Sequence, residues 1–460
     1  MNNFLDDTIA ALATAPGKGA IAIVRMSGSK SIEILSCVFA GPKKLDELAS
    51  GRLMLGRIIF SNNTNVVDKV LVSIYRNPHS FTGENVVEIS CHGGTLVVKE
   101  ILGLLLENGA RMANPGEFTQ RAFLNGKMDL LQAESVADVI DSQTRYSLMQ
   151  SQNQLSGKLS ERLMHFKARM TKQLALLEIE LDFSEDDIEF ASRDELIGNI
   201  DELLSEIDTL LDTFVYGKVL REGVHLALVG RPNVGKSSIL NRLIEEDRAI
   251  VSDIPGTTRD VIEEAFDIDG LLFKISDTAG LRITKDEVEK QGVTRTKDVL
   301  SKADLILFIV EAGEDFTRED IEASKIINDA AEGALVFLLI NKTDLHPNQI
   351  KVKSDQIFRE RIELSAKTGA GFLTLKQKIS KQFLSEDINF AFINKARHQD
   401  ALRRTKKSLV HAKDSLNNDL SSEYISLDVR SAIDALGEIT GEVTTENILN
   451  EIFSSFCIGK

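Results

Sequence analysis

The sequence of 460 residues contains no tryptophan and only three cysteines, Cys37, Cys91 and Cys457. Three widely spaced cysteines argue against a disulfide framework and a zinc ribbon, and they fit a reducing compartment. The chain also lacks any run of 18 apolar residues, and its first residues lack a basic stretch followed by an apolar core. We therefore expect a soluble, cytoplasmic protein with no membrane partner.

Positive charge is also scarce. Lys and Arg number 54 against 70 Asp and Glu, a net charge of -16, and no long segment is basic overall. A general polyanion binder is therefore disfavoured. A nucleic-acid contact would need a local patch on a predicted helix, although such a patch is more often its solvated face. The residues of that patch are Arg397, Arg403, Arg404, Lys406, Lys407 and Lys413.

The most informative motif that is present runs from Gly230 to Ser237 (GRPNVGKS). It lies between an apolar run at 224–229 and an amphipathic helix that opens near Ser238. A phosphate-binding loop needs this strand-loop-helix setting, because its glycines let backbone N–H groups surround the phosphates and the helix N-terminus favours negative charge. Lys236 would reach the β- and γ-phosphates, and Ser237 would bind magnesium.

Four further segments follow the spacing of a guanine-nucleotide site. Residues 256–260 (GTTRD) form a polar switch region in which Thr258 would be the second hydroxyl ligand to magnesium. Residues 277–280 (DTAG) follow a strand-like run, where the carboxylate can hold magnesium through water and the glycine can sense the γ-phosphate. Residues 341–344 (NKTD) and 365–367 (SAK) also follow apolar runs, so they would bind the base at strand ends.

Base recognition would depend on Asp344, which can accept from the ring N–H and the exocyclic amine of guanine together. Adenine lacks this donor pair, so we expect discrimination against ATP of roughly 10⁴. The motifs together predict a protein that binds and hydrolyses GTP. The predicted GTP contacts are Asn233, Val234, Gly235, Lys236, Ser237, Ser238, Ser252, Asp253, Ile254, Pro255, Gly256, Thr257, Thr258, Asp277, Thr278, Ala279, Gly280, Asn341, Lys342, Asp344, Ser365, Ala366 and Lys367.

One catalytic group of Ras-type GTPases is missing. Leu281 follows the DTAG segment, where those enzymes carry the Gln that orients the attacking water. Leucine cannot polarise water, so charge stabilisation and water positioning must come from other residues. The candidates are Arg259, Asp260, Arg282 and the acidic segment 286–289, although any one of these charged residues is more often part of a solvated surface.

The length corresponds to about three domains. Residues 1–118 mix short strand-like runs with one clear helix, which indicates an α+β domain. The runs lie at 20–24, 53–60, 69–75 and 86–90, and the helix lies at 95–107.

Helical spacing dominates from 121 to 217 and again from 385 to 455, with a break near Ser184 and a helix at 196–214. The first of these helical regions carries an apolar stripe that is expected to form core: Leu148, Leu155, Leu159, Leu163, Phe166, Met170, Leu174, Leu177 and Leu181. We therefore predict a multidomain fold in which a Ras-like α/β P-loop GTPase domain is inserted into a discontinuous all-α helical domain. The predicted boundaries are 1–120, 121–220, 221–382 and 383–460.

The chain resembles the bacterial tRNA-modification GTPase family MnmE, also called TrmE, over essentially its full length. The resemblance rests on APGKGAIAIVRMSG, SFTGENVVEISCHGG and PGEFTQRAFLNGKMDLLQAE near the N-terminus, on DIPGTTRD and DTAGLR in the GTPase module, and on FCIGK at 456–460. Ser252 occupies a place that can be Thr in relatives, which preserves an oxygen ligand.

The resemblance implies a homodimer that works with the flavoprotein MnmG (GidA) as a heterotetramer. The pair would add an aminomethyl or carboxymethylaminomethyl group at C5 of the wobble uridine, U34, of certain tRNAs, with GTP hydrolysis and a tetrahydrofolate one-carbon donor in its 5-formyl or methylene form. The N-terminal domain would bind folate and mediate dimerisation. Its folate-binding residues would be Arg25, Glu88, Lys127 and Lys460; basic groups can pair a glutamate tail and a carboxylate suits pterin N–H groups.

The resemblance also implies how hydrolysis proceeds without the glutamine. A potassium ion would take the place of an arginine finger as two GTPase domains meet across a dimer, held by Asn233, Thr257 and backbone oxygens of Ser252 and Ile254. Glu289 would position the water indirectly, and Arg259 and Asp260 would support the switch.

Three questions stay open from the sequence. Cys457 is a possible nucleophile or redox group near the implied folate site, or it is simply buried. A ribosome-assembly GTPase of the Era or EngA kind would share the GTP motifs, but this chain shows neither a second phosphate loop nor a GxxG clamp. A nucleotide-operated scaffold with no chemistry beyond GTP is the third reading.

Overall fold

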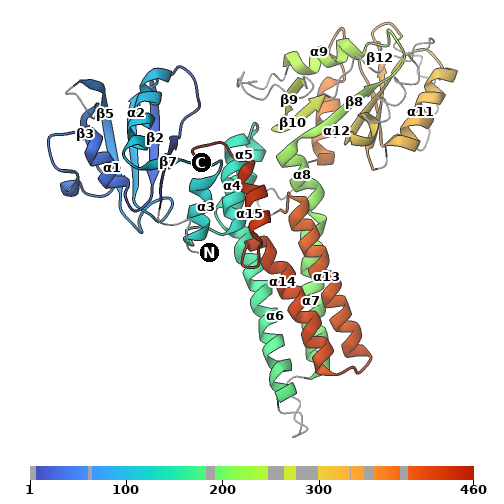
Figure 1. The fold of residues 1–460 in the computed structure, drawn as a ribbon. Helices are drawn as coiled ribbons and strands as arrows, with labels where there is room; N and C mark the ends of the chain where they lie inside the picture. Colours follow the sequence, from blue (N-terminus) through green and yellow to red (C-terminus); the bar gives the residue numbers. More distant parts are fainter. Residues whose placement is uncertain are drawn as a thin grey trace, which may run out of the picture. The chain divides into compact units, whose positions relative to one another are not determined.

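The computed structural model describes residues 7–60, 65–182, 192–246, 264–275, 299–331, 333–346, 357–383 and 392–460. The chain divides into two compact units (Figure 1). The first comprises 1–137, 154–200 and 404–460, and the second comprises 138–153 and 201–403. Among the described residues, no helix is both long enough and apolar enough to cross a membrane.

The first unit contains a seven-stranded sheet in the order β3-β4-β5-β6-β2-β1-β7. Its strands are β1 (Thr8–Leu12), β2 (Ile21–Ser27), β3 (Phe39–Ala40), β4 (Leu53–Ile59), β5 (Val66–Tyr75), β6 (Val86–His92) and β7 (Ala110–Met112). The pairing is antiparallel except between β1 and β7. Helices α1 (Ser31–Val38) and α2 (Thr95–Glu107) share one core with the strands. A smaller core joins β1 to Phe118 of α3 (Glu117–Leu124).

The remaining helices of this unit include α6 (Lys158–Asp182) and α14 (Ser422–Thr440), which pack along each other. Arg430 pairs with Glu178 across them, and the Ser422 hydroxyl donates to Glu180 at 3.0 Å. In α6 the predicted apolar stripe is confirmed as core at Leu159, Leu163, Phe166, Met170 and Leu177, which are buried, whereas Leu174 and Leu181 are only partly buried. The stripe prediction is wrong for Leu148, which is 43% exposed on α5 (Arg145–Leu155).

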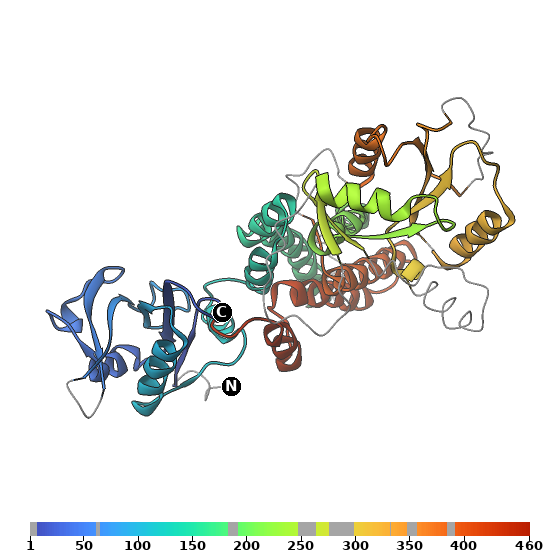
Figure 2. The same ribbon diagram turned by 90° about the horizontal axis from the view of Figure 1, so that it is seen from above.

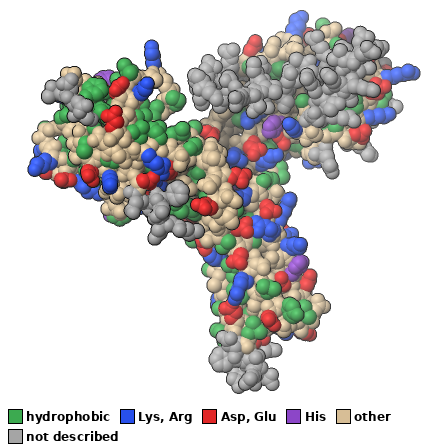
Figure 3. Space-filling view, in the orientation of Figure 1, with side chains coloured by type: hydrophobic (Ala, Val, Ile, Leu, Met, Phe, Trp, Pro, Cys, Tyr) green, Lys and Arg blue, Asp and Glu red, His purple; other side chains and the backbone are tan. Residues whose placement is uncertain are grey.

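The other long helices are α4 (Leu130–Asp141), α7 (Arg193–Asp212), α13 (Ala396–Asn417) and α15 (Glu446–Ser454). Helix α13 carries the candidate basic patch. Within it, the guanidinium of Arg404 bonds both carboxylate oxygens of Glu438 on α14. On the face shown in Figure 3, basic and acidic side chains are interspersed over the helices. That mixture agrees with the solvated-face interpretation of the patch.

The second unit contains a six-stranded sheet (Figures 1 and 2), and its strand order is β13-β12-β11-β8-β10-β9. Its strands are β8 (Val224–Val229), β9 (Glu264–Ile268), β10 (Leu271–Ile275), β11 (Leu305–Glu311), β12 (Leu335–Asn341) and β13 (Glu360–Glu363). All neighbours are parallel except β9 and β10. Strands β8, β11 and β12 are almost continuously apolar, which is typical of a parallel sheet covered on both faces.

Helices cover both faces of this sheet. Helices α9 (Lys236–Glu246) and α12 (Phe372–Phe383) share one core with the strands, and α11 (Arg318–Ala330) packs in a second core on the opposite face. This is a doubly wound α/β fold, in which ligands bind at the carboxyl ends of the strands. The apolar runs that the sequence placed at 224–229 and 334–340 correspond to β8 and β12.

Both connections to this α/β portion converge on one carboxylate. Asp138, near the end of α4, accepts from Arg221 Nε at 3.0 Å, and Arg221 closes α8 (Phe214–Glu222) just before β8. The other carboxylate oxygen of Asp138 lies 3.5 Å from the Nζ atom of Lys395. Lys395 follows the last strand and helix of the α/β portion in the sequence. Because the Asp138 side chain is only 7% exposed, this ion pair is shielded from water.

Candidate functional site

The predicted phosphate loop forms between β8 and α9. Gly230 has φ 153°, and a Cβ there would lie 2.3 Å from the carbonyl oxygen of Ile309. Gly235 has φ 103°, and a Cβ there would lie 2.2 Å from Asn341 Nδ2. The Lys236 ammonium donates to the carbonyl oxygens of Gly230 at 2.5 Å and Arg231 at 2.8 Å. The lysine therefore ties the start of the loop to α9, and the two glycines leave no room for a side chain.

Within this loop, Asn233 adopts a left-handed backbone conformation with φ 64°. Val234 is buried, whereas Ser237 and Ser238 are exposed in the first turn of α9. An exposed hydroxyl at a helix N-terminus is accessible to a phosphate-bound cation.

The base-recognition segment begins where β12 ends. Asn341 is 2% exposed, its Nδ2 donates to the carbonyl oxygen of Val234 at 2.8 Å, and its Oδ1 accepts from the N–H of Ala366 at 3.0 Å. Asp344 is exposed, and its Oδ1 accepts from the Ser365 hydroxyl at 2.6 Å. The structure thus brings together three motifs that are spread between residues 230 and 367 of the sequence.

The loop before α11 supports the same region. Lys342, with φ 64°, donates to Glu311 at 2.6 Å. Arg231 reaches from the phosphate loop to Glu314 at 2.6 Å and to Asp320 at 3.1 Å. Sequence reasoning missed Arg231, because its position in the motif is not restricted to one residue type.

Several predicted residues lie outside the described residues, so their roles stay predictions. They belong to the two segments that adjoin β9 and β10. They are Ser252, Asp253, Ile254, Pro255, Gly256, Thr257, Thr258, Arg259, Asp260, Asp277, Thr278, Ala279, Gly280, Leu281, Arg282 and Glu289.

A second candidate site lies in the first unit around Arg25. Arg25 on β2 and Glu88 on β6 are direct cross-strand partners, and the Arg25 guanidinium donates to Glu88 Oε1 at 2.7 and 2.9 Å. The same guanidinium lies 5.7 Å from the ring centre of Phe81 and 5.8 Å from that of Phe118. Lys127, which the sequence also predicts to bind folate, donates to the carbonyl oxygen of Pro78 at 2.9 Å. The Arg25–Glu88 pair is about a quarter exposed, so its polar atoms are accessible.

Residues 456–460 lie against the N-terminal part of the chain. The N–H of Phe118 donates to the carbonyl oxygen of Lys460 at 3.2 Å, and Pro115 and Ile458 form an isolated bridge. A Cβ on Gly459 would lie 2.1 Å from the carbonyl oxygen of Leu12. Of the two alternatives for Cys457, simple burial is wrong, because Cys457 is exposed while Cys91 is buried.

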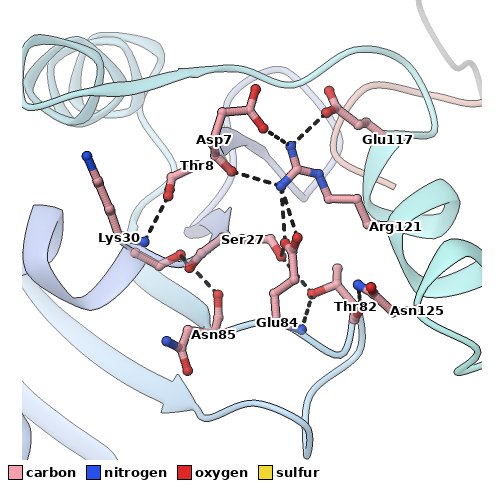
Figure 4. A network of polar contacts seen from close by, with 12 residues as sticks. Asp7, Thr8, Ser27, Lys30, Thr82, Glu84, Asn85, Glu117, Arg121 and Asn125 are labelled. Carbon is pink, nitrogen blue, oxygen red and sulfur yellow. Dashed lines mark hydrogen bonds and ion pairs between the residues drawn. The ribbon is translucent and has the colours of Figure 1, made fainter. Parts of the chain in front are cut away.

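A partly buried ionic network adjoins this region (Figure 4). The Arg121 side chain is only 3% exposed and contacts Asp7 at 2.5 Å, Glu117 at 3.0 Å and Glu84 at 3.2 Å. Arg111 also pairs with Asp7 and Glu117. Burial raises the pKa of Asp7 and Glu117, but the hydrogen bonds from the arginines outweigh it and hold both pKa values below their usual range. Sequence reasoning missed this network, since its members have no motif in common.

Two family models match the chain. The model described as GTP-binding protein TrmE N-terminus matches residues 8–127, and the MnmE helical domain model matches residues 130–457. The first covers the seven-stranded sheet and α3, and the second covers all later helices and the α/β sheet between them.

The chain is also similar to curated proteins over nearly its whole length. It is 42% identical over 464 residues to a protein from Alkaliphilus metalliredigens named tRNA modification GTPase MnmE, and 40% identical over 464 residues to one of the same name from Alkaliphilus oremlandii. Each match spans 99% of this chain and 100% of the relative. A solved structure of Aquifex aeolicus Era is 24% identical, covers 40% of this chain and 66% of that chain, and has a TM-score of 0.26, from which nothing follows.

Proposed function

The chain belongs to the MnmE (TrmE) family of tRNA modification GTPases and is a GTP-hydrolysing enzyme, and from that premise we propose the following reaction. With MnmG (GidA), the protein adds an aminomethyl or carboxymethylaminomethyl group at C5 of U34 in certain tRNAs. The observation that carries the proposal is the assembly of the phosphate loop, Asn341, Asp344 and Ser365 at one sheet edge, in a chain that also holds the Arg25–Glu88 pair.

The α/β portion would supply the GTPase activity. Backbone N–H groups of the loop and Lys236 bind the phosphates, Ser237 and Thr258 bind magnesium, and Asp344 binds guanine. The fit is supported by Gly230 and Gly235, where an added Cβ would meet the Ile309 carbonyl oxygen and the Asn341 side chain, so that only glycine keeps this loop conformation. A potassium ion held by Asn233, Ser252, Ile254 and Thr257 would complete the charge stabilisation when two such domains meet in the homodimer, with Glu289, Arg259 and Asp260 in support.

The N-terminal residues 1–120 would bind a tetrahydrofolate derivative. The Arg25–Glu88 pair is flanked by two aromatic rings and is accessible, which suits a ligand with a flat heteroaromatic ring and a carboxylate tail. Lys127 and Lys460 would add positive charge. Residues 121–220 and 383–460 would form one helical domain around the inserted GTPase domain 221–382, so that nucleotide state and helix packing are coupled.

Two measurements test the proposal. The purified protein with MnmG, GTP, a folate donor, ammonium or glycine as the source of nitrogen, and unmodified tRNA is expected to yield C5-modified U34, read by nucleoside mass spectrometry. GTP turnover is expected to be faster in potassium than in sodium. Unmodified U34 would contradict the tRNA reaction, and equal rates in the two salts would contradict the potassium site alone.

A 5-formyl-tetrahydrofolate titration tests the folate site separately. Binding is expected for the wild type and is expected to be lost in Arg25→Ala, because the guanidinium both pairs Glu88 and faces the two rings. Undiminished binding by the variant would place the folate elsewhere.

A further inference from the structure

The loop from Ser365 to Gly371 orients both residues that would read guanine. Its Ser365 hydroxyl donates to Asp344 at 2.6 Å, and its Ala366 N–H donates to the side chain of Asn341 at 3.0 Å. The loop is closed internally, because Gly369 N–H donates to the carbonyl oxygen of Ser365 at 2.9 Å. A shift of this loop would therefore move Asp344 and Asn341 together.

One side chain outside the loop binds three of its carbonyl oxygens. Arg242, in the second turn of α9, donates to the carbonyl oxygens of Ala366 at 3.2 Å, Lys367 at 3.3 Å and Thr368 at 3.4 Å. Its guanidinium lies 5.6 Å from the ring centre of Phe372, the first residue of α12. A planar guanidinium with five fixed donors suits successive carbonyls, whereas an ammonium is a single point charge.

The loop is shaped to receive this guanidinium. Gly369 has φ 86°, and a Cβ at this position would lie 2.2 Å from Arg242 Nη2. Any other residue type would meet both a strained backbone and the arginine. Since α9 also begins with the phosphate-binding Lys236, the same helix contacts the phosphate end and the base end of the nucleotide site.

We propose that Arg242 is a positioning residue for guanine recognition, which holds the 365–371 loop so that Asp344 and Asn341 face the base. It acts through its hydrogen bonds to the loop backbone. The inference rests on the proposed guanine site and deepens it: Arg242 sets the discrimination of guanine from related purines. Without the guanidinium, Asp344 loses its fixed orientation and the exocyclic amine of guanine loses its contribution to affinity.

The test compares GTP with ITP, which lacks only the exocyclic amine. Arg242→Met keeps the apolar stem against Phe372. In this variant the Kd of GTP is expected to rise about tenfold and the Kd of ITP much less, so that the ratio of the ITP Kd to the GTP Kd falls toward one. Arg242→Lys is expected to restore part of the ratio. Turnover at saturating GTP is expected to stay within about twofold of wild type, because the phosphates are untouched.

Arg361→Ala is the matched control, since Arg361 lies on β13 of the same sheet and faces the half-exposed Glu363 at 3.7 Å. Its GTP to ITP ratio is expected to equal that of the wild type. An unchanged ratio in Arg242→Met, or an equal loss of affinity for both nucleotides, overturns the proposal. A wild type that does not prefer GTP to ITP instead overturns the guanine site itself, so the two failures are distinguishable.

Discussion

At the scale of single residues, the nucleotide motifs are readable from sequence because geometry restricts their residue types. Gly235 illustrates this restriction: its φ of 103° and its approach to Asn341 exclude a side chain. Arg121 illustrates the opposite case, since its partners Asp7, Glu84 and Glu117 come from three separate segments. Nothing in their spacing indicates that they meet.

Arg231 gives a prediction at this scale. Arg231→Ala removes the link from the phosphate loop to Glu314 and to the nearly fully buried Asp320. The loop then loses a fixed anchor, so we expect the Kd of GDP and of GTP to rise about five- to tenfold. Titration with a fluorescent GDP analogue measures this. Arg318→Ala, which changes an exposed arginine at the start of α11, is expected to leave both affinities unchanged.

The Arg121 network gives a second prediction. Arg121→Met removes the buried guanidinium from Asp7, Glu84 and Glu117, while Arg111 continues to pair Asp7 and Glu117, and we expect the free energy of unfolding to fall by about 3 kcal/mol at pH 7. Urea denaturation measures it. Arg404→Met, which breaks a more exposed pair with Glu438, is expected to cost less than about 1 kcal/mol. Equal losses in the two variants would contradict a special role for burial.

The same network predicts a direction of pH dependence. The folded-state pKa values of Asp7 and Glu117 lie below their ordinary values of 3.8 and 4.5. Their contribution to stability is therefore complete above those values and is lost as pH falls through the folded pKa values. Accordingly, the stability difference between wild type and Arg121→Met is expected to narrow below about pH 4.

At the scale of elements, long or strongly patterned segments were predictable. The helix at 95–107 and the strand-like runs at 53–60 and 86–90 correspond to α2, β4 and β6. The short β3 and β7 were missed, because two or three residues carry no period and are held only by their sheet neighbours.

At this scale, Asp138 contacts both Arg221 at the end of α8 and Lys395 after the α/β portion. Asp138→Asn weakens the contacts to Arg221 and Lys395, so we expect α8 and residues 392–395 to exchange amide hydrogens faster, with a stability loss of about 2 kcal/mol. Hydrogen exchange with mass spectrometry reads both segments. Asp414→Asn, on α13, provides a control of the same chemistry. Unchanged exchange at both connections would show that Asp138 does not anchor them.

At the scale of the whole molecule, the structure joins segments from opposite ends of the sequence. Residues 456–460 contact the ends of β1 and α3. Lys460 bonds the backbone of Phe118, and the ring of Phe118 faces Arg25. Gly459→Val would place a side chain against the carbonyl oxygen of Leu12 and displace this segment. We expect it to weaken 5-formyl-tetrahydrofolate binding at least about tenfold while GTP turnover is preserved. Ser454→Ala is the control. Loss of both folate binding and GTP turnover in Gly459→Val would indicate general misfolding.

Sequence alone was enough to identify the GTP motifs, the α/β and helical segments and the family resemblance, because each depends on local residue type, spacing or periodicity. The folded structure was needed to show that Cys457 is exposed, that Leu148 lies outside the core, and that Arg242 bonds the 365–371 loop. Those outcomes depend on which distant segments come together. Long-range contacts follow from how whole helix and sheet faces pack, and no short stretch of sequence encodes them.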